Sequence, residues 1–134
     1  MSTHHTEQAA RGYLMYQLAR RGYTVQFTDS RFPTEDLLVV SESGKHFGID
    51  VKGQRTENFW QFSYKRPSLE LFIACVYVPT DRPARCFILP STSAMKLWKA
   101  YKTSAKKRGV SHERWGINWG TALSFEDRWD LLPT

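Results

Sequence analysis

Three polar side chains occupy alternate positions in the otherwise apolar stretch "FGIDVKGQ", residues 47–54. They are Asp50, Lys52 and Gln54, and Ile49 and Val51 lie between them. Side chains of a β-strand point to opposite faces with a period of two, so the polar set shares one face. A surface ion pair between Asp50 and Lys52 on a solvated face is one interpretation. A carboxylate and a lysine facing the same site could also act on a phosphate ester, with a metal ion as their partner.

Two further carboxylates belong to elements that can approach this strand. Asp36 begins the apolar stretch "DLLVVSE", and "SGKH" at 43–46 predicts a hairpin turn around Gly44 that returns Asp50 to the neighbourhood of Asp36. Glu7 lies in the first turn of a helix predicted over 6–21, with Thr6 as its N-cap. The sequence thus allows three carboxylates and one lysine to meet.

This constellation resembles the PD-(D/E)xK nuclease superfamily, which includes restriction enzymes and archaeal Holliday-junction resolvases. Its signature is a carboxylate at the start of one strand and Asp or Glu, any residue, Lys on the next, here Asp36 and Asp50-Val51-Lys52. Glu7 matches a glutamate in the first helix of many members, and Gln54 matches a glutamine two positions past the lysine. The resemblance covers residues 4–54. The sequence departs from the PD of the family name directly before Asp36, where Glu35 stands in place of proline; the nearest proline is Pro33.

The resemblance implies an α/β fold: a restriction-endonuclease-like αβββαβ core, with a central mixed sheet flanked by helices. It also implies a Mg²⁺-dependent endodeoxyribonuclease, with Mn²⁺ as a substitute, that could select for DNA structure or cleave junctions. Asp36, Asp50 and the Val51 carbonyl would bind the metal, joined by Glu7 directly or through water. Lys52 would hold or deprotonate the attacking water, and Gln54 would orient it. The same matched residues define the expected catalytic set: Glu7, Asp36, Asp50, Lys52, Gln54.

Each of these residues also has a plain structural interpretation. Glu7 could favour a helix N-terminus through its charge, and Asp36 could be a turn residue. Asp50 and Lys52 could form the surface pair, and Gln54 could mark a solvated strand end. All of these structural interpretations would have to be true at once, although the residues occur in the order and topology that the nuclease fold requires.

The remaining elements predict one domain over residues 1–134, a size sufficient for a single hydrophobic core. A nearly continuous apolar run over 69–79 predicts a central strand covered on both faces. The other predicted elements are a strand at 23–29, a loop at 31–36, an aromatic strand at 58–64, a strand at 85–90, a helix at 91–109 and a short helix at 124–132.

Composition limits the class of protein and its surroundings. No apolar run approaches the roughly 20 residues that span a bilayer, so we expect no membrane association. The polar start "MSTHHTEQ" lacks the order of a signal peptide, which predicts a cytoplasmic protein. Cys75 and Cys86 lie in apolar runs without CxxC spacing, and we expect both to be buried and reduced.

A net charge of +6, from 19 basic and 13 acidic side chains, suits a polyanionic partner such as DNA; RNA is not distinguished from it. A solvated helix face is the ordinary explanation for the lysine stripe at 96–106, and a phosphate-tracking surface is the other. The candidate nucleic-acid-binding residues are Lys65, Arg66, Lys99, Lys102 and Lys106. Trp60, Phe62 and Tyr64 could stack on unpaired bases, although an aromatic strand face is more often core.

Two other expectations concern assembly. A lone active site cuts one strand, so a double-strand break or paired junction cuts would favour a homodimer. The alternative to an enzyme is a non-catalytic nucleic-acid-binding module on the same fold, or a subunit of a larger nuclease assembly.

Overall fold

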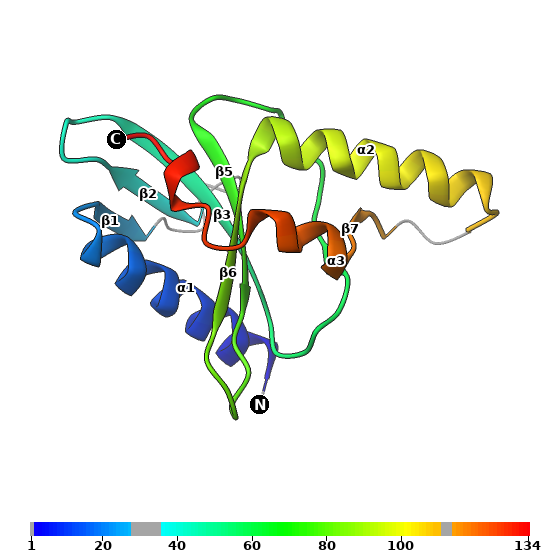
Figure 1. Ribbon diagram of the computed structural model, residues 1–134, viewed down its shortest axis with the longest axis horizontal. Coiled ribbons are helices and arrows are strands. Elements are labelled where there is room, and N and C mark those ends of the chain that lie inside the picture. Colours follow the sequence, from blue (N-terminus) through cyan, green and yellow to red (C-terminus); the bar gives the residue numbers. More distant parts are fainter. Residues whose placement is uncertain (1, 28–35, 111–113) are drawn as a thin grey trace.

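A computed structural model describes residues 2–27, 36–110 and 114–134 of the chain (Figure 1). Apart from Asp36, the loop predicted at 31–36 lies outside the described residues, as do Pro33 and Glu35. The elements in chain order are α1 (Thr3–Arg20), β1 (Thr24–Phe27), β2 (Leu37–Val40), β3 (His46–Gln54), β4 (Trp60–Gln61), β5 (Leu71–Tyr77), β6 (Arg85–Pro90), α2 (Ser91–Lys107), β7 (Gly116–Ile117), α3 (Trp119–Ala122) and the 3₁₀ turns Leu123–Phe125 and Trp129–Leu131.

A mixed five-stranded sheet forms the centre, in the order β1-β2-β3-β5-β6. The β3 and β5 strands are parallel, and every other neighbouring pair is antiparallel. Helices flank the sheet, so the predicted α/β class with a central mixed sheet is confirmed (Figure 1). Every residue of β5 is buried, as expected for a strand covered on both faces.

Each face of the sheet has its own hydrophobic core. On one face, Leu14 and Leu18 of α1 pack with Ile49 and Val51 of β3. On the other face, Met95 of α2 packs in a cluster with strand residues such as Ile73 and Phe87 and with Trp60 from β4. Alternate side chains of β3 and β5 serve the two cores in turn, which fixes the direction in which the polar residues of β3 must point.

The connection from β3 to β5 differs from the expected αβββαβ order. That order places a helix between these parallel strands, but residues 55–70 form β4 and extended chain with no helix. We call residues 55–70 the crossover. Its β4 strand pairs with β7, and α2, which follows β6, packs against β5 and β6. A helix and an extended strap therefore cover this sheet face together.

Several element boundaries differ from the predictions. The first helix begins at Thr3, and Ser2 is its N-cap, whose side chain accepts from the His5 N–H; the prediction of Thr6 as the cap was wrong. Glu7 consequently lies in the second turn, beyond the reach of the helix-terminal dipole that could have explained it. The aromatic strand is only two residues long, and the C-terminal helix is broken into α3 and two 3₁₀ turns.

Other local predictions are confirmed. Gly22, Gly44 and Gly109 all adopt positive φ, as their places after a helix, in the hairpin turn and after α2 require. Cys75 and Cys86 are buried free thiols. None of the helices within the described residues is long and apolar enough to cross a lipid bilayer.

Candidate active site at the start of β2 and the centre of β3

Asp50 and Lys52 lie on the β3 face opposite α1, as the alternation predicts. Ile49 and Val51 join the α1 core, whereas Asp50 and Lys52 pair in register with Ile73 and Cys75, which belong to the α2-side core. The face is covered rather than solvated, because the crossover passes over it. Asp50 is only 4% exposed. A surface ion pair therefore does not describe this residue.

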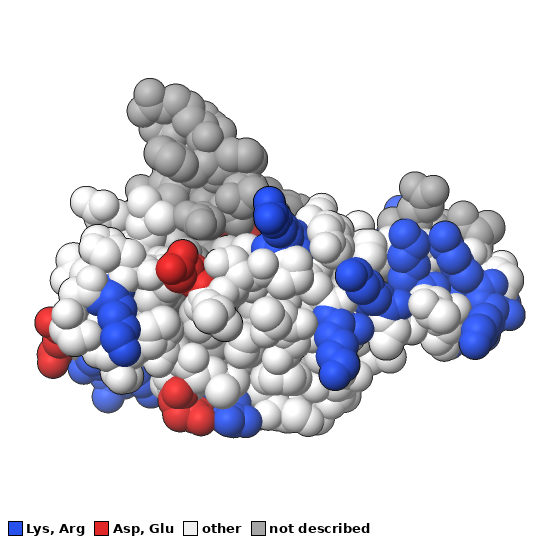
Figure 2. All heavy atoms as spheres, turned by 90° about the horizontal axis from the view of Figure 1, so that it is seen from above, with Lys and Arg blue, Asp and Glu red and all other residues white. Residues whose placement is uncertain are grey.

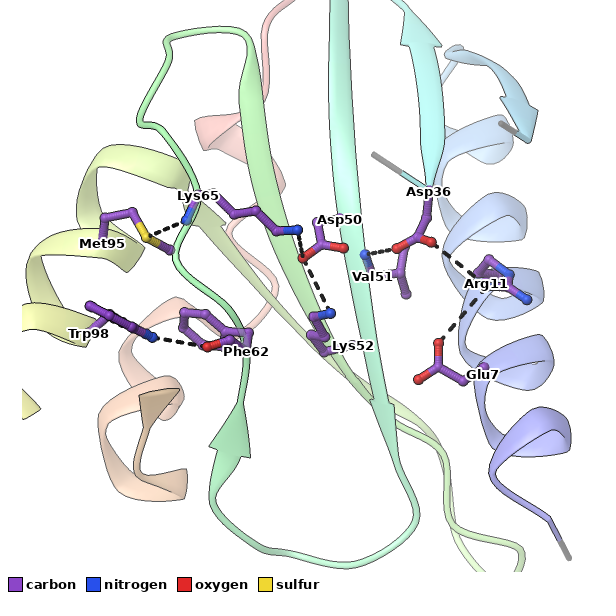
Figure 3. Close-up of polar contacts among 10 residues, drawn as sticks. All are labelled: Glu7, Arg11, Asp36, Asp50, Val51, Lys52, Phe62, Lys65, Met95 and Trp98. Atoms are coloured by element: carbon purple, nitrogen blue, oxygen red, sulfur yellow. Dashed lines mark hydrogen bonds and ion pairs between the residues drawn. The ribbon is translucent and has the colours of Figure 1, made fainter. Parts of the chain in front are cut away.

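The Asp36 carboxylate is held against the backbone of β3. The Asp36 N–H donates to the Ile49 carbonyl over 2.9 Å, and the Val51 N–H donates to Asp36 Oδ2 over 2.7 Å (Figure 3). The Asp36 side chain thus accepts a hydrogen bond where the pairing of β2 with β3 ends. This arrangement fixes one carboxylate beside the strand that carries the other, as the hairpin predicts.

Asp50 is a buried carboxylate without full compensation. Its Oδ2 lies 3.5 Å from Lys52 Nζ and 3.9 Å from Lys65 Nζ, both beyond good hydrogen-bonding distance for an ion pair. Among the described residues this buried oxygen has no hydrogen-bond partner. Burial raises the pKa of Asp50 to about 6; the two ammonium groups oppose this rise, and the neighbouring Asp36 carboxyl adds to it.

Glu7 reaches this pair only through a third residue. Arg11 Nη1 lies 3.9 Å from Glu7 Oε2 and 3.8 Å from Asp36 Oδ1, so the guanidinium stands between the two carboxylates (Figure 3). Within residues 2–27, 36–110 and 114–134, no three His, Cys, Asp or Glu side chains are grouped closely enough to hold a metal. Asp36 and Asp50 are therefore the two carboxylates that lie together, and the expected contribution of Glu7, directly or through water, stays a prediction.

The approach of α1 to β3 depends on Gly53. A Cβ at this position would lie 2.7 Å from the Ala10 Cβ and 3.1 Å from the Thr6 carbonyl oxygen. Only glycine lets the helix lie this close without displacement. The closeness brings Glu7 and Arg11 within reach of Asp36.

Gln54 has a structural contact of its own. Its Nε2 donates to the Asn58 carbonyl over 2.7 Å and so closes the turn that follows β3. This contact is structural, and the expected role of Gln54 in orienting water stays a prediction.

Two basic residues of the site were not assigned to it from the sequence. Arg11 follows Glu7 by four positions on a helix, a spacing that places the two side chains on one face and could have identified it. Lys65 was expected on a nucleic-acid-binding surface with Arg66, but its side chain is only 12% exposed and points at Asp50. Its backbone N–H contacts Met95 Sδ at 3.1 Å, which holds the crossover on α2. No sequence signal locates Lys65, because the crossover reaches Asp50 through tertiary structure alone.

The lysines of α2 extend from this site along the outer side of the helix. Lys99 Nζ lies 5.5 Å from the ring centre of Tyr64, and Lys102 Nζ lies 5.3 Å from that of Trp98. Figure 2 shows lysine and arginine side chains gathered at the α2 end of the molecule, and Lys106 is exposed there. Of the three aromatic residues expected to stack or pack, Trp60 and Phe62 are buried and Tyr64 is exposed.

The donor set fits a divalent cation in part. The Asp36 and Asp50 carboxylates are neighbours, and one buried Asp50 oxygen has no hydrogen-bond donor within the described parts of the chain, which is the chemistry that Mg²⁺ or Mn²⁺ would satisfy. Comparison of the chain with known protein families, with curated proteins and with solved structures found no match.

Proposed function

We propose that the chain is a metal-dependent nuclease that hydrolyses DNA phosphodiester bonds, built on a variant of the restriction-endonuclease-like core. The observation that carries the proposal is the approach of Asp36 to Asp50 beside Lys52, with the buried Asp50 oxygen left without a hydrogen bond from any described residue. A structural ion pair would place its ammonium in direct contact with the carboxylate. Here both lysines stand back from it.

Asp36 and Asp50 would hold Mg²⁺, and the Val51 carbonyl is the expected third ligand. The bound cation would supply polarisation of the scissile phosphate and a lowered pKa for a coordinated water. Glu7 would act from outside this pair, through water or through Arg11. A site with two protein carboxylates suits Mg²⁺, which keeps several of its waters.

The basic residues would act on the substrate rather than on the cation. Lys52, whose Nζ lies 3.5 Å from Asp50 Oδ2, would hold the attacking water and offset charge that develops on the phosphate during attack. Lys65 approaches the same Asp50 oxygen from the crossover and adds positive charge on the substrate side. Arg11 holds the Asp36 carboxylate by its second oxygen, while the Val51 N–H holds the first.

The test is incubation of purified protein with single-stranded, duplex, overhanging and branched DNA and with RNA, in Mg²⁺, Mn²⁺ or EDTA. We expect metal-dependent cleavage that Asp50→Ala and Lys52→Ala each abolish while the circular dichroism spectrum is kept. Lys45→Ala, at an exposed turn position, is the charge-matched control and should cleave normally. Cleavage at the parental rate by Asp50→Ala or Lys52→Ala would show that the assigned site is wrong.

A nucleic-acid-binding module without cleavage is the second candidate, and one observation favours it. Among the described residues of the site, three cations, Arg11, Lys52 and Lys65, face three carboxylates, Glu7, Asp36 and Asp50, so their charges balance without a metal. Such balance weakens the attraction for a cation. Binding of DNA that is equal in Mg²⁺ and EDTA, with no cleavage of any form, would select this function.

A further inference from the structure

A hollow of about 300 Å³ adjoins the catalytic strand on the side of α2, and the proposed chemistry does not use it. Lys52 forms one wall, and the crossover, α2 and Trp115, which precedes β7, supply the rest. Its lining residues are Lys52, Gln61, Phe62, Ser63, Trp98 and Trp115. The volume is at the lower end of the range for small-molecule sites, so the hollow can take one planar group rather than a large ligand.

Trp98 is fixed at the edge of this hollow. Its Nε1 donates to the Phe62 carbonyl over 2.9 Å, which sets the plane of the indole (Figure 3). Beyond it, the Tyr64 ring lies 5.5 Å from the Trp98 ring, centre to centre, and is 48% exposed. An aromatic surface therefore runs outward from the hollow.

Lysines accompany these rings. Lys102 lies over Trp98, and Lys99 lies over Tyr64. Alternating aromatic rings and ammonium groups are the arrangement that binds single-stranded nucleic acid, because bases stack on the rings while the cations follow the phosphates. The α2 helix contributes lysines and no Asp or Glu.

The position of the hollow restricts what can occupy it. A ligand in contact with Lys52 lies next to the phosphate that Lys52 would contact during cleavage. A base in a continuous duplex is stacked and paired, and it can enter such a hollow only after it leaves the helix. An unpaired base needs no such step, and the exposed Gln61 and Ser63 offer it polar contacts.

We infer that the substrate carries an unpaired nucleotide next to the scissile phosphate, and that its base enters this hollow against Trp98. The inference rests on the proposed nuclease function and specifies its substrate class. Single strands, overhangs, flaps and unpaired branch points belong to this class, and an uninterrupted blunt duplex does not. The strand then leaves along Tyr64, Lys99 and Lys102.

Binding in EDTA tests the inference separately from cleavage. The probes are a fluorescent 15-nucleotide single strand, the matching blunt duplex, and the duplex with a single-stranded overhang. We expect the first and third to bind at least tenfold more tightly than the blunt duplex, in the range that stacking of one base supplies. A 2-aminopurine base, moved along the overhang, should be quenched most at the nucleotide beside the cleaved phosphate.

Two substitutions locate the effect without removing Trp98, whose hydrogen bond holds the crossover. Ser63→Leu fills the hollow from an exposed backbone position and should abolish the quenching. Tyr64→Ala should weaken single-strand binding at least fivefold and leave duplex binding unchanged. Tyr16→Ala is the matched control, because Tyr16 is also an exposed tyrosine with a cation, Arg20, over its ring, and it lies on α1, on the other side of the sheet.

The outcomes separate the two proposals. If the protein cleaves DNA in Mg²⁺ but binds all three probes equally, the nuclease proposal stands and the unpaired-nucleotide inference is overturned. Quenching that survives in Ser63→Leu overturns it as well. If no form of nucleic acid is bound or cleaved, both proposals fall.

Discussion

The raised pKa of Asp50 makes the stability of this protein depend on pH in an unusual direction. A carboxyl whose folded pKa lies above its unfolded value binds protons more readily in the folded state. Stability should therefore fall as pH rises from about 4 to about 6, and the loss should be complete above pH 6. Paired carboxylates, whose pKa values are lowered, give the opposite slope.

The size of the effect follows from the shift. The pKa of Asp50 rises from 3.8 to about 6, and each unit corresponds to 1.36 kcal/mol, so the ionised carboxylate costs the fold about 3 kcal/mol. Asp50 is buried, so solvent screening removes little of this amount. Asp50→Asn abolishes the charge and keeps nearly the same shape. The variant should lose this pH dependence.

The assay is urea unfolding in EDTA at pH 4 and pH 8. The free energy of unfolding of Asp50→Asn minus that of the parent should be more positive at pH 8 than at pH 4 by about 2 to 3 kcal/mol. The change with pH is the diagnostic quantity, because the variant also leaves the Lys65 ammonium without its carboxylate. Asp81→Asn, at an exposed position paired with Arg82, is the control and should show little of this difference.

Mg²⁺ extends the same experiment. A cation bound at Asp36 and Asp50 favours the ionised carboxylate, so it should stabilise the parent at pH 8 and leave Asp50→Asn unaffected. A parent and an Asp50→Asn variant whose difference in unfolding free energy is the same at both pH values would refute the assignment of Asp50 as a buried, charge-strained group. Stabilisation of both proteins by Mg²⁺ would place the cation elsewhere.

Three further predictions test other parts of the site. Gly53→Ala should destabilise the fold by about 1 to 3 kcal/mol in urea unfolding and reduce cleavage, because the added Cβ would collide with α1. Gly12→Ala, which has open space around it, is the control and should be neutral or stabilising. Equal effects of the two substitutions would contradict the role given to the close approach of α1 to β3. Asp36→Asn should need far more Mg²⁺ for cleavage than Glu7→Gln, since Asp36 would contact the cation directly and Glu7 would not. The cleavage rate is measured as Mg²⁺ is titrated, and equal or reversed Mg²⁺ requirements would show that the ligand roles are misassigned. Neutralising Lys99, Lys102 and Lys106 together should flatten the dependence of log binding constant on log salt, and an unchanged slope would leave these lysines as an ordinary solvated face.

The part of the site that the sequence predicts is the part built by local structure. Asp36 and Asp50 are joined by one hairpin, whose turn is marked by Gly44, and strict alternation on β3 separates Asp50 and Lys52 from Ile49 and Val51. Both signals depend on only a few neighbouring residues, so they are valid whatever packing the rest of the chain adopts. The covered strand β5 is predicted from local sequence as well, because a nearly continuous apolar run of this length indicates a strand that is buried on both faces.

The contacts that the sequence does not predict come from packing over long distances. Lys65 meets Asp50 because the crossover lies extended across the sheet, and no periodicity in residues 55–70 indicates which face it covers. The burial of Asp50 follows from the same cover. The start of α1 was misplaced for a different reason: Ser2 and Thr6 are both good N-cap residues, and propensity alone does not choose between them.

The crossover and α2 form one fastened unit. Ser68 and Ser91 exchange hydrogen bonds of 2.9 and 2.7 Å where the crossover ends and α2 begins, and Trp98 holds the middle of the crossover. The β4 strand pairs with β7, which packs against α2. Asp36, Asp50 and Lys52 belong to a different part, the β2–β3 hairpin. Under the proposed function, the two metal-binding carboxylates lie on one segment of chain and most residues that would select the substrate lie on another, with Lys52 common to both groups. Directed evolution could therefore randomise the exposed residues Gln61, Ser63 and Tyr64 and the outer face of α2 to obtain new substrate preferences while the β2–β3 hairpin is left unchanged.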